Sequence, residues 1–246
     1  MKKNIFIIGG SGLIGLNLVN LLDNKINNIF VIDKINRFKE NKNIKFINLD
    51  ITNIDIFKKK ILKVFKKYKP NSMVNCSYPK TNDWFKNDYK RIKYKSYQKN
   101  ICLHLNSYVW IAKFFLDEMT KDKTENRSIV LLSSIYGFLG QNSNLYKGQK
   151  IRENLTYSVI KGGIINVVRS FASYYGKYQI RINCVSPGGV VNKQDNKFIK
   201  KYSNLVPLKR MANSSEIAEV INFLISEKSS YITGQNIIVD GGYSII

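Results

Sequence analysis

The chain has 246 residues, 44% of them hydrophobic, and it carries a formal net charge of +23. That much apolar material suits one large domain, here residues 1–246, rather than two small ones. No stretch approaches the roughly 20 consecutive apolar residues of a membrane-spanning helix, and the first apolar run leads into a glycine motif rather than a cleavage site. Three scattered cysteines and a single His argue against a disulfide framework or a metal site. We therefore expect a cytoplasmic protein without a membrane anchor or a bound metal.

The positive charge raises the question of nucleic-acid binding. Most of the 40 basic residues are Lys, they run through nearly every expected helix, and they accompany many Asn and Ile. This distribution indicates a chain-wide compositional bias toward Lys and a solvated surface rather than one basic patch, so it argues against nucleic acid as a partner. A positive surface would still attract phosphorylated or nucleotide-linked substrates.

Short apolar runs alternate with longer amphipathic runs along the chain. Parallel strands need crossover connections, and helices fill them here, so the pattern predicts an α/β protein with a doubly wound parallel sheet of the Rossmann type. The less regular segments 78–95, 138–154 and 188–209 follow strand ends, where such a sheet places its ligand site. The expected strands are 5–8, 29–32, 44–49, 72–75, 129–133, 179–185 and 235–239, and the expected helices are 13–22, 54–68, 99–119, 157–175 and 214–225.

A glycine-rich turn follows the first strand and opens directly into the first helix. Its glycines permit a tight turn, bring backbone N–H groups close to a pyrophosphate, and let the helix pack on the sheet with its N-terminus toward the negative charge. A single turn of this kind is weak evidence, but the strand before it and the helix after it agree. The predicted cofactor-binding residues of the turn are Gly9, Ser11, Gly12, Leu13, Ile14 and Gly15.

An acidic residue, Asp33, ends the second strand, 18 positions after Gly15. A carboxylate there can accept hydrogen bonds from the adenosine ribose and repel a 2′-phosphate, which favours NAD over NADP. Lys34 beside it would partly offset that repulsion, so NADP stays possible. The alternative for Asp33 is an exposed strand-end carboxylate without a ligand.

Two further strand ends reach the same edge of the sheet. Asp50 and Ile51 close the third strand and are placed to border the adenine, while Asn75 closes the fourth and is placed to border the ribose. Asp50 could equally be the N-cap of the helix that starts near Thr52.

A tyrosine and a lysine four residues apart, Tyr157 and Lys161, start a predicted helix and therefore share one face. Tyrosine has a reference pKa of about 10, but a neighbouring ammonium and a nicotinamide cation favour tyrosinate. Ser134, at the end of the strand 129–133, can hydrogen-bond the reacting oxygen and hold it near the tyrosine. A solvated helix face would explain the Tyr and Lys pair alone. Together with the glycine turn and the serine, the pair predicts proton transfer to or from an alcohol or ketone.

From end to end the chain resembles the short-chain dehydrogenase/reductase family. The resemblance implies a proton relay through Ser134, Tyr157 and Lys161, ribose contacts from Tyr157 and Lys161, and nicotinamide contacts from Pro187, Gly188 and Val190. It also implies homodimers or homotetramers, with the helices 99–119 and 157–175 at the interface. The matching elements are the turn 9–15, Asp33, Asp50 with Ile51, Asn75, the run 134–137, Tyr157 with Lys161, and the runs 181–188 and 231–242.

The sequence also departs from the family pattern. After Asn75 the usual Asn-Ala-Gly is replaced by Cys76-Ser77-Tyr78-Pro79-Lys80, and the segment between Ser134 and Tyr157 is longer than in most members. The helix asparagine that completes the family's water relay through Lys161 is replaced by His104. A His can pass a proton, with an unperturbed pKa near 6.5, so His104 is a candidate catalytic residue. As the only His it is equally well explained as a satisfied interior residue.

These departures resemble a branch called flagellin modification protein A, which is associated with making the nine-carbon or related sugars of bacterial surfaces. The resemblance implies an anionic, sugar-like substrate and a place in carbohydrate biosynthesis. Lys80, Lys147 and Arg152 are candidates for its carboxylate or phosphate, or they are ordinary surface residues.

Two other functions compete with a dehydrogenase or reductase. An epimerase or dehydratase would keep the cofactor and use transient oxidation, which the GxxGxxG spacing of related sugar-nucleotide enzymes permits. A cofactor sensor or nucleic-acid-binding regulator is favoured only by charge. The Ser, Tyr and Lys set argues against the last, because a sensor needs no proton donor.

Overall fold

A single parallel sheet organises the molecule. The computed structural model describes residues 3–22, 27–39, 42–122, 125–149 and 151–246. Within them the sheet has seven parallel strands in the order β3-β2-β1-β4-β5-β6-β7, which confirms the predicted doubly wound fold. The strands are β1 Asn4–Ile8, β2 Asn28–Asp33, β3 Ile44–Asn48, β4 Ser72–Asn75, β5 Arg127–Leu132, β6 Ile180–Pro187 and β7 Asn236–Val239.

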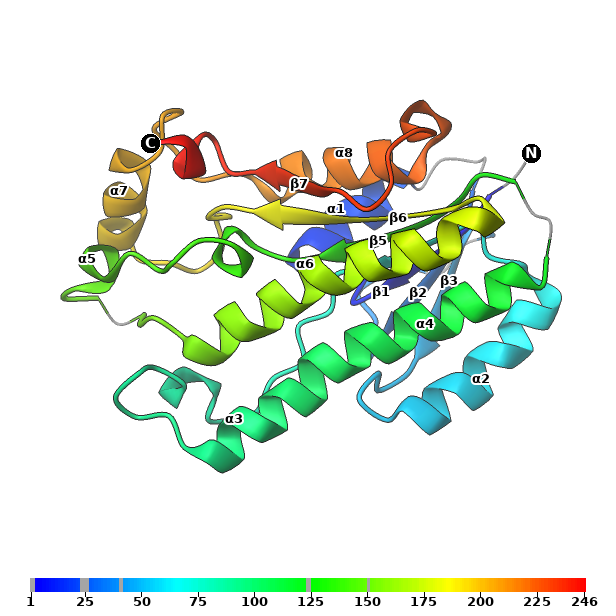
Figure 1. The fold of residues 1–246 in the computed structure, drawn as a ribbon, viewed down its shortest axis with the longest axis horizontal. Coiled ribbons are helices and arrows are strands. Elements are labelled where there is room, and N and C mark those ends of the chain that lie inside the picture. Colours follow the sequence, from blue (N-terminus) through cyan, green and yellow to red (C-terminus); the bar gives the residue numbers. More distant parts are fainter. Residues whose placement is uncertain (1–2, 23–26, 40–41, 123–124, 150) are drawn as a thin grey trace.

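Helices cover both faces of the sheet (Figure 1). Helices α2, α4 and α6 pack side by side on one face, and α1 packs against α8 on the other. The helices are α1 Leu13–Leu22, α2 Ile54–Lys67, α3 Tyr94–Asn100, α4 Ser107–Thr120, α5 Ser143–Tyr146, α6 Leu155–Tyr175, α7 Asn196–Asn204 and α8 Ser214–Ile225.

The central strands are continuous apolar runs because both of their faces are buried. In β1, Phe6 and Ile8 belong to the core beneath α2, α4 and α6, whereas Ile5 and Ile7 belong to the core beneath α1 and α8. The Phe6 ring stacks on Phe30 of β2 at a centroid distance of 4.5 Å. Because both faces of these strands are buried, the strand ends and the loops that follow them are held at set positions along one edge of the sheet.

The strand order reverses direction between β1 and β4. The loop after β1 leads to α1 on one face, and the chain after β4 leads toward α4 on the other, so a crevice opens at the carboxyl ends of these strands. The glycine turn, the loop after β4, and the ends of β5 and β6 all lie at this edge.

The long helix predicted over residues 99–119 is longer and less regular than expected. Helical structure runs from Tyr94 to Thr120, but residues Ile101–Asn106 form a π-helical turn between α3 and α4. The Ser107 hydroxyl donates to the carbonyls of Leu103 at 2.7 Å and His104 at 3.0 Å, so a side chain competes for acceptors of this turn. Such turns are frequent at functional sites, and this one contains His104.

Two helices lie in segments expected to be irregular. The short α5 lies within 138–154, and α7 lies within 188–209. Helix α7 has only nine residues, and its apolar face buries only Phe198 and Tyr202, so the amphipathic stretch is short. Its start is fixed instead by Asp195, whose side chain accepts from the Phe198 amide at 2.8 Å.

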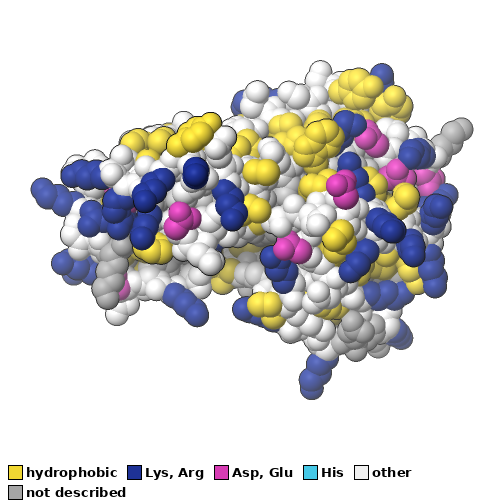
Figure 2. All heavy atoms as spheres, turned by 90° about the horizontal axis from the view of Figure 1, so that it is seen from below, with side chains coloured by type: hydrophobic (Ala, Val, Ile, Leu, Met, Phe, Trp, Pro, Cys, Tyr) yellow, Lys and Arg dark blue, Asp and Glu magenta, His cyan; other side chains and the backbone are white. Residues whose placement is uncertain are grey.

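The surface is rich in basic side chains. On the face drawn in Figure 2, Lys and Arg side chains are scattered from one end to the other, with only a few Asp and Glu among them. Among the helices of the described residues, none is both long enough and apolar enough to cross a bilayer.

Candidate active site

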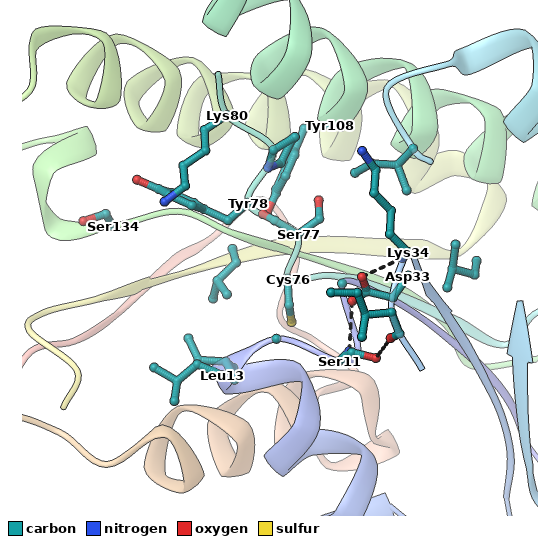
Figure 3. A pocket seen from close by; sticks show the side chains of 18 of the residues that line it. Ser11, Leu13, Asp33, Lys34, Cys76, Ser77, Tyr78, Lys80, Tyr108 and Ser134 are labelled. Carbon is teal, nitrogen blue, oxygen red and sulfur yellow. Dashed lines mark hydrogen bonds between the residues drawn. The ribbon is translucent and has the colours of Figure 1, made fainter. Parts of the chain in front are cut away.

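A cavity of about 710 Å³ occupies the crevice at the carboxyl edge of the sheet (Figure 3). Most of the residues predicted to bind cofactor or to act in catalysis line it, although they come from six separate segments of the chain. Three predicted residues, Gly15, Asn75 and His104, do not. The predicted residues in the wall are Gly9, Ser11, Gly12, Leu13, Ile14, Asp33, Asp50, Ile51, Ser134, Tyr157, Lys161, Pro187, Gly188 and Val190.

The glycine turn leaves its backbone open to the cavity. Gly9 has a φ of +73°, and a Cβ there would lie 2.5 Å from the backbone nitrogen of Ser77. The first amides of α1 have no carbonyl ahead of them within the helix, so they are available to an anion. The turn therefore fits the pyrophosphate of a dinucleotide.

Gly15 has a packing role instead of a place in the cavity wall. A Cβ at Gly15 would lie 2.3 Å from the Gly9 carbonyl oxygen and 2.7 Å from the Gly10 Cα. Only a residue without a side chain lets α1 approach the turn this closely. Gly15 thus lies outside the cavity wall and acts through the packing of α1 on the turn, while its contribution to cofactor binding stays a prediction.

The carboxylate of Asp33 is held by the backbone at the end of β2. Its Oδ2 accepts from the Ser11 amide at 3.0 Å and its Oδ1 from the Lys34 amide at 2.7 Å. These bonds orient the carboxylate toward the cavity (Figure 3). Each oxygen keeps a lone pair for a ligand hydroxyl.

Asp50 forms a turn and an ion pair and is not a helix N-cap. Its Oδ1 accepts from the Thr52 amide at 2.9 Å, while the cap of α2 is Asn53, which accepts from the Ile56 amide at 3.1 Å. The N-cap alternative for Asp50 was therefore wrong. The Lys34 ammonium lies 2.7 Å from Asp50 Oδ2. Partial burial raises the pKa of Asp50, but hydrogen bonds from Lys34 and Thr52 outweigh it and hold that pKa below its usual value.

Asn75 supports the cavity from behind. It is fully buried, and its Oδ1 accepts from the Ser77 amide at 3.1 Å and the Ser77 hydroxyl at 2.6 Å. Ser77 in turn closes against Gly9. The Oδ1 atom of Asn75 is therefore directed at the loop after β4, and Ser77 lies between Asn75 and the cavity. This geometry does not support the predicted direct contact between Asn75 and the ribose.

Tyr157 and Lys161 lie one turn apart at the start of α6. Asn154 caps this helix by accepting from the Tyr157 amide at 2.9 Å. The Lys161 ammonium donates to the Leu132 carbonyl at 2.9 Å and lies 5.6 Å from the centre of the Tyr157 ring. The Ser133 hydroxyl donates to the Lys161 carbonyl at 2.8 Å, which ties α6 to the end of β5. The adjacent Ser134 is thereby placed beside the tyrosine.

Burial dominates the ionisation of these groups. It raises the pKa of Tyr157, and a hydrogen bond with Ser134 lowers it by less. It also lowers the pKa of Lys161 to about 7. The expectation that the ammonium favours tyrosinate therefore does not hold for the protein alone, because desolvation disfavours both charged forms. A neutral phenol at neutral pH is suited to donate a proton to a carbonyl oxygen.

An aromatic wall, which sequence reasoning missed, stands beside the catalytic side chains. Tyr78 presents its ring at centroid distances of 6.0 Å from Tyr157, 5.8 Å from Trp84 and 5.2 Å from His104. The Lys80 ammonium lies 5.3 Å from the Tyr78 ring centre, and both side chains face the cavity near Ser134 in Figure 3. The signal for this wall was the bulky Tyr-Pro-Lys sequence at a position where the family has small residues.

His104 lies behind this wall, fully buried in the π-helical turn. Neither ring nitrogen has a hydrogen-bond partner among the described residues. Burial, reinforced by the charge of Lys161, holds the pKa of His104 well below its usual value, so the ring is neutral. The alternative of a satisfied interior histidine is not what the structure shows, while its part in a relay stays a prediction.

The three candidate anion contacts are not together. Lys80 lines the cavity, whereas Lys147 and Arg152 are absent from its wall. Lys147 ends α5, and its carbonyl accepts from the Lys201 ammonium at 2.9 Å. The three therefore do not line one cavity.

Comparisons with known proteins agree with this geometry. A family model described as enoyl-(acyl carrier protein) reductase matches residues 25–244. Post-translational flagellin modification protein A of Campylobacter coli is 32% identical over 257 residues, covering 99% of each chain. A 3-oxoacyl-(acyl-carrier-protein) reductase of Buchnera aphidicola is 32% identical over 213 residues, covering 85% of this chain and 80% of the relative.

A solved structure extends the agreement to the fold. The crystal structure of a short chain dehydrogenase from Leptospira borgpetersenii with bound NAD+ has a TM-score of 0.89 and 28% identity, covering 99% of this chain and 93% of the other. Fold and site together define an oxidoreductase that uses a nicotinamide dinucleotide. The chain belongs to the short-chain dehydrogenase/reductase family, which confirms the resemblance found in the sequence.

Proposed function

We propose that this protein interconverts an alcohol and a ketone on a polar, anionic, sugar-like substrate with NAD as the preferred cofactor, in the synthesis of a surface-glycan or flagellin-modifying sugar. The observation that carries the proposal is the meeting of Ser134, Tyr157 and Lys161 in the same cavity as the glycine turn and Asp33. The sugar assignment draws its support from the relative named flagellin modification protein A and from Lys80 in the cavity wall.

The residues supply the proton chemistry of the reaction. A bound nicotinamide supplies or accepts the hydride. In the reductive direction Ser134 donates a hydrogen bond to the substrate carbonyl oxygen, and Tyr157 transfers its phenolic proton to that oxygen. Lys161, 5.6 Å from the ring centre, stabilises the phenolate that is left and binds the ribose. In the oxidative direction the same tyrosine takes the proton from the alcohol.

The preference for NAD rests on how the charges are paired. Asp33 faces the cavity with its carboxylate held by two backbone amides, so a 2′-phosphate would meet a fixed negative charge. Lys34 is engaged with Asp50, which reduces its capacity to offset that charge. Arg37 also lines the cavity and offers a cation to a 2′-phosphate, which keeps NADP as the second cofactor.

We infer that His104 takes the asparagine's position in the proton relay, with a water bridging to Lys161. A neutral ring offers one donor and one acceptor, and neither nitrogen has a hydrogen-bond partner in the part of the chain that the structure describes. We expect His104→Asn to keep kcat within a few-fold and His104→Ala to lower it roughly 10- to 100-fold. The pH profile of kcat for each variant checks this. Equal losses in both variants, with an unchanged profile shape, would show a packing role only.

The direct test of the proposed function is turnover with a panel of substrates. NADH absorbance is followed with keto forms of activated surface sugars, and NAD reduction with the corresponding alcohols. We expect net cofactor oxidation with a keto sugar. A rearranged sugar without net change in NADH would indicate the epimerase or dehydratase. An acetoacetyl thioester serves as the comparison substrate, because of the acyl-carrier-protein reductase relative, and turnover of it alone would overturn the sugar assignment.

We also infer a homodimer or homotetramer that uses α4 and α6. Both helices present large apolar side chains outward, among them Trp110 and Val159, and Tyr174 follows near the end of α6. Monomeric proteins rarely leave such groups together in solvent. Sedimentation equilibrium is expected to give two or four times the 28.4 kDa chain mass, and a monomer at micromolar concentration would contradict the inference.

A further inference from the structure

A second hollow of about 510 Å³ adjoins the outer end of the active-site cavity. Lys80 lines both spaces, so its side chain stands between them. The remainder of the second hollow comes from the loop after Lys80 and from α3 and the turn that follows it. Its other lining residues are Thr81, Asn82, Asp83, Lys95, Ser96, Lys99 and Leu103.

The hollow has an excess of positive charge. Lys80, Lys95 and Lys99 contribute three ammonium groups, and Asp83 contributes the carboxylate in its wall. Hydrogen bonds from Thr81 and then Ser96 hold the pKa of Asp83 below its usual value, so it stays ionised and offsets one charge. Of the described carboxylates, none is within ion-pair distance of these three ammonium groups, unlike Lys34 or Lys113, which are paired.

A network of polar side chains holds the hollow in place. Part of it comes from the segment 78–95, which was expected to be irregular. The buried Asn100 accepts from the Thr81 amide at 2.9 Å and donates to the Thr81 hydroxyl at 2.8 Å. Asn87 donates to Ser96 at 2.9 Å and accepts from Thr156 at 2.7 Å. Thr156 directly precedes Tyr157. The lysine-lined wall is therefore held at a set position relative to the catalytic tyrosine.

We propose that this hollow, the Lys80–Lys95–Lys99 pocket, binds a phosphate or diphosphate group of the substrate while the reacting carbon lies at Tyr157. The inference rests on the proposed function and names its substrate class as a phosphorylated or nucleotide-linked sugar. Three cations against one carboxylate match a group with two or more negative charges, and a single sugar carboxylate would leave most of that charge unused. Lys80 then bridges the phosphate and the sugar.

The test uses pyrophosphate as the probe, with the protein saturated with NADH so that the glycine turn is occupied. Binding is measured by calorimetry for the native protein and for the double variant Lys95→Gln/Lys99→Gln. The matched control is Lys59→Gln/Lys63→Gln on α2, which removes two exposed lysines with the same spacing far along the chain from the hollow. We expect the Kd for pyrophosphate to rise about tenfold or more in the first variant and less than twofold in the control.

The proposal would be overturned if pyrophosphate did not bind, or if acetate bound as tightly as pyrophosphate. Equal weakening of pyrophosphate binding in both double variants would also overturn it, because that result would indicate general surface charge. NADH affinity is expected to be unchanged in every variant. Pyrophosphate binding that follows this pattern in a protein that turns over no sugar would refute the proposed function and leave the anion site standing. If both double variants turned over phosphorylated and unphosphorylated keto sugars with the same KM, the anion site would be refuted and the proposed function would stand.

Discussion

Replacing Tyr157 with Phe is expected to lower kcat of the nicotinamide-linked reaction about 10²- to 10⁴-fold, the range by which a positioned acid or base accelerates proton transfer. The substitution removes one oxygen from a side chain that packs against Tyr78 and Trp84. The rings stay in place, so we expect NADH affinity within about twofold of the native value. Steady-state turnover and NADH titration measure the two quantities separately.

Tyr174→Phe is the matched control for this substitution. Tyr174 lies on the same helix, and its side chain is 59% exposed, so loss of its hydroxyl should leave kcat unchanged. Retention of more than a tenth of native kcat in Tyr157→Phe would mean that another group donates the proton. The neighbouring Tyr78 would then be the first candidate, since its ring also faces Lys161 at 5.9 Å.

Gly9→Ala is expected to abolish cofactor binding. The new Cβ would meet the Ser77 backbone at 2.5 Å, and alanine would have to adopt a φ of +73°. The left-handed conformation alone costs roughly 1–2 kcal/mol, and the clash must also displace either the turn or the loop after β4. Because both border the cavity, we expect the Kd for NADH to rise at least 100-fold.

Gly148→Ala separates the cost of the left-handed conformation from the effect of the steric clash. Gly148 also has a φ of +73°, but a Cβ there would meet nothing within 4 Å. We expect this variant to lose a little stability and to bind NADH normally. Circular dichroism and thermal unfolding show whether each variant is folded. A folded Gly9→Ala protein with native NADH affinity would contradict the assignment of the glycine turn as the phosphate site.

The framework of the fold could be predicted because its physical signals are local. The bounds of α1, β4 and α8 match the expectation to the residue, since a buried helix face or a strand buried on both sides leaves a clear apolar pattern. The glycine turn, Asp33, Ser134, Tyr157 and Lys161 were found for a related reason: each lies at the junction of a strand and a loop or at a helix start. Their meeting in one cavity follows from the parallel sheet.

The features that the sequence did not predict depend on contacts between segments that are distant in the chain. The π-helical turn at His104 requires the competition of Ser107 for its carbonyls. Helix α7 is short, and it is stabilised by its Asp195 cap and by Phe198 and Tyr202, which pack in a small separate cluster. The place of Tyr78 against Tyr157 and the network from Thr81 to Thr156 join residues about 70 to 80 positions apart. No local pattern carries such information. The effect of burial on the pKa of Tyr157 could not be predicted for the same reason, because burial is a tertiary property.

Titration of the purified protein with NADH and, separately, NADPH tests whether the cavity at the carboxyl edge of the sheet is a nicotinamide dinucleotide site. The emission of bound NADH and the quenching of protein fluorescence report binding, with Trp84 close to Tyr157 as one of the reporters. We expect saturable binding at one site per chain, with a lower Kd for NADH than for NADPH. We expect Asp33→Ser to narrow the ratio of the two Kd values about tenfold or more. Absence of binding by either cofactor, or binding unaffected by both Gly9→Ala and Asp33→Ser, would contradict the assignment of the cavity as a dinucleotide site.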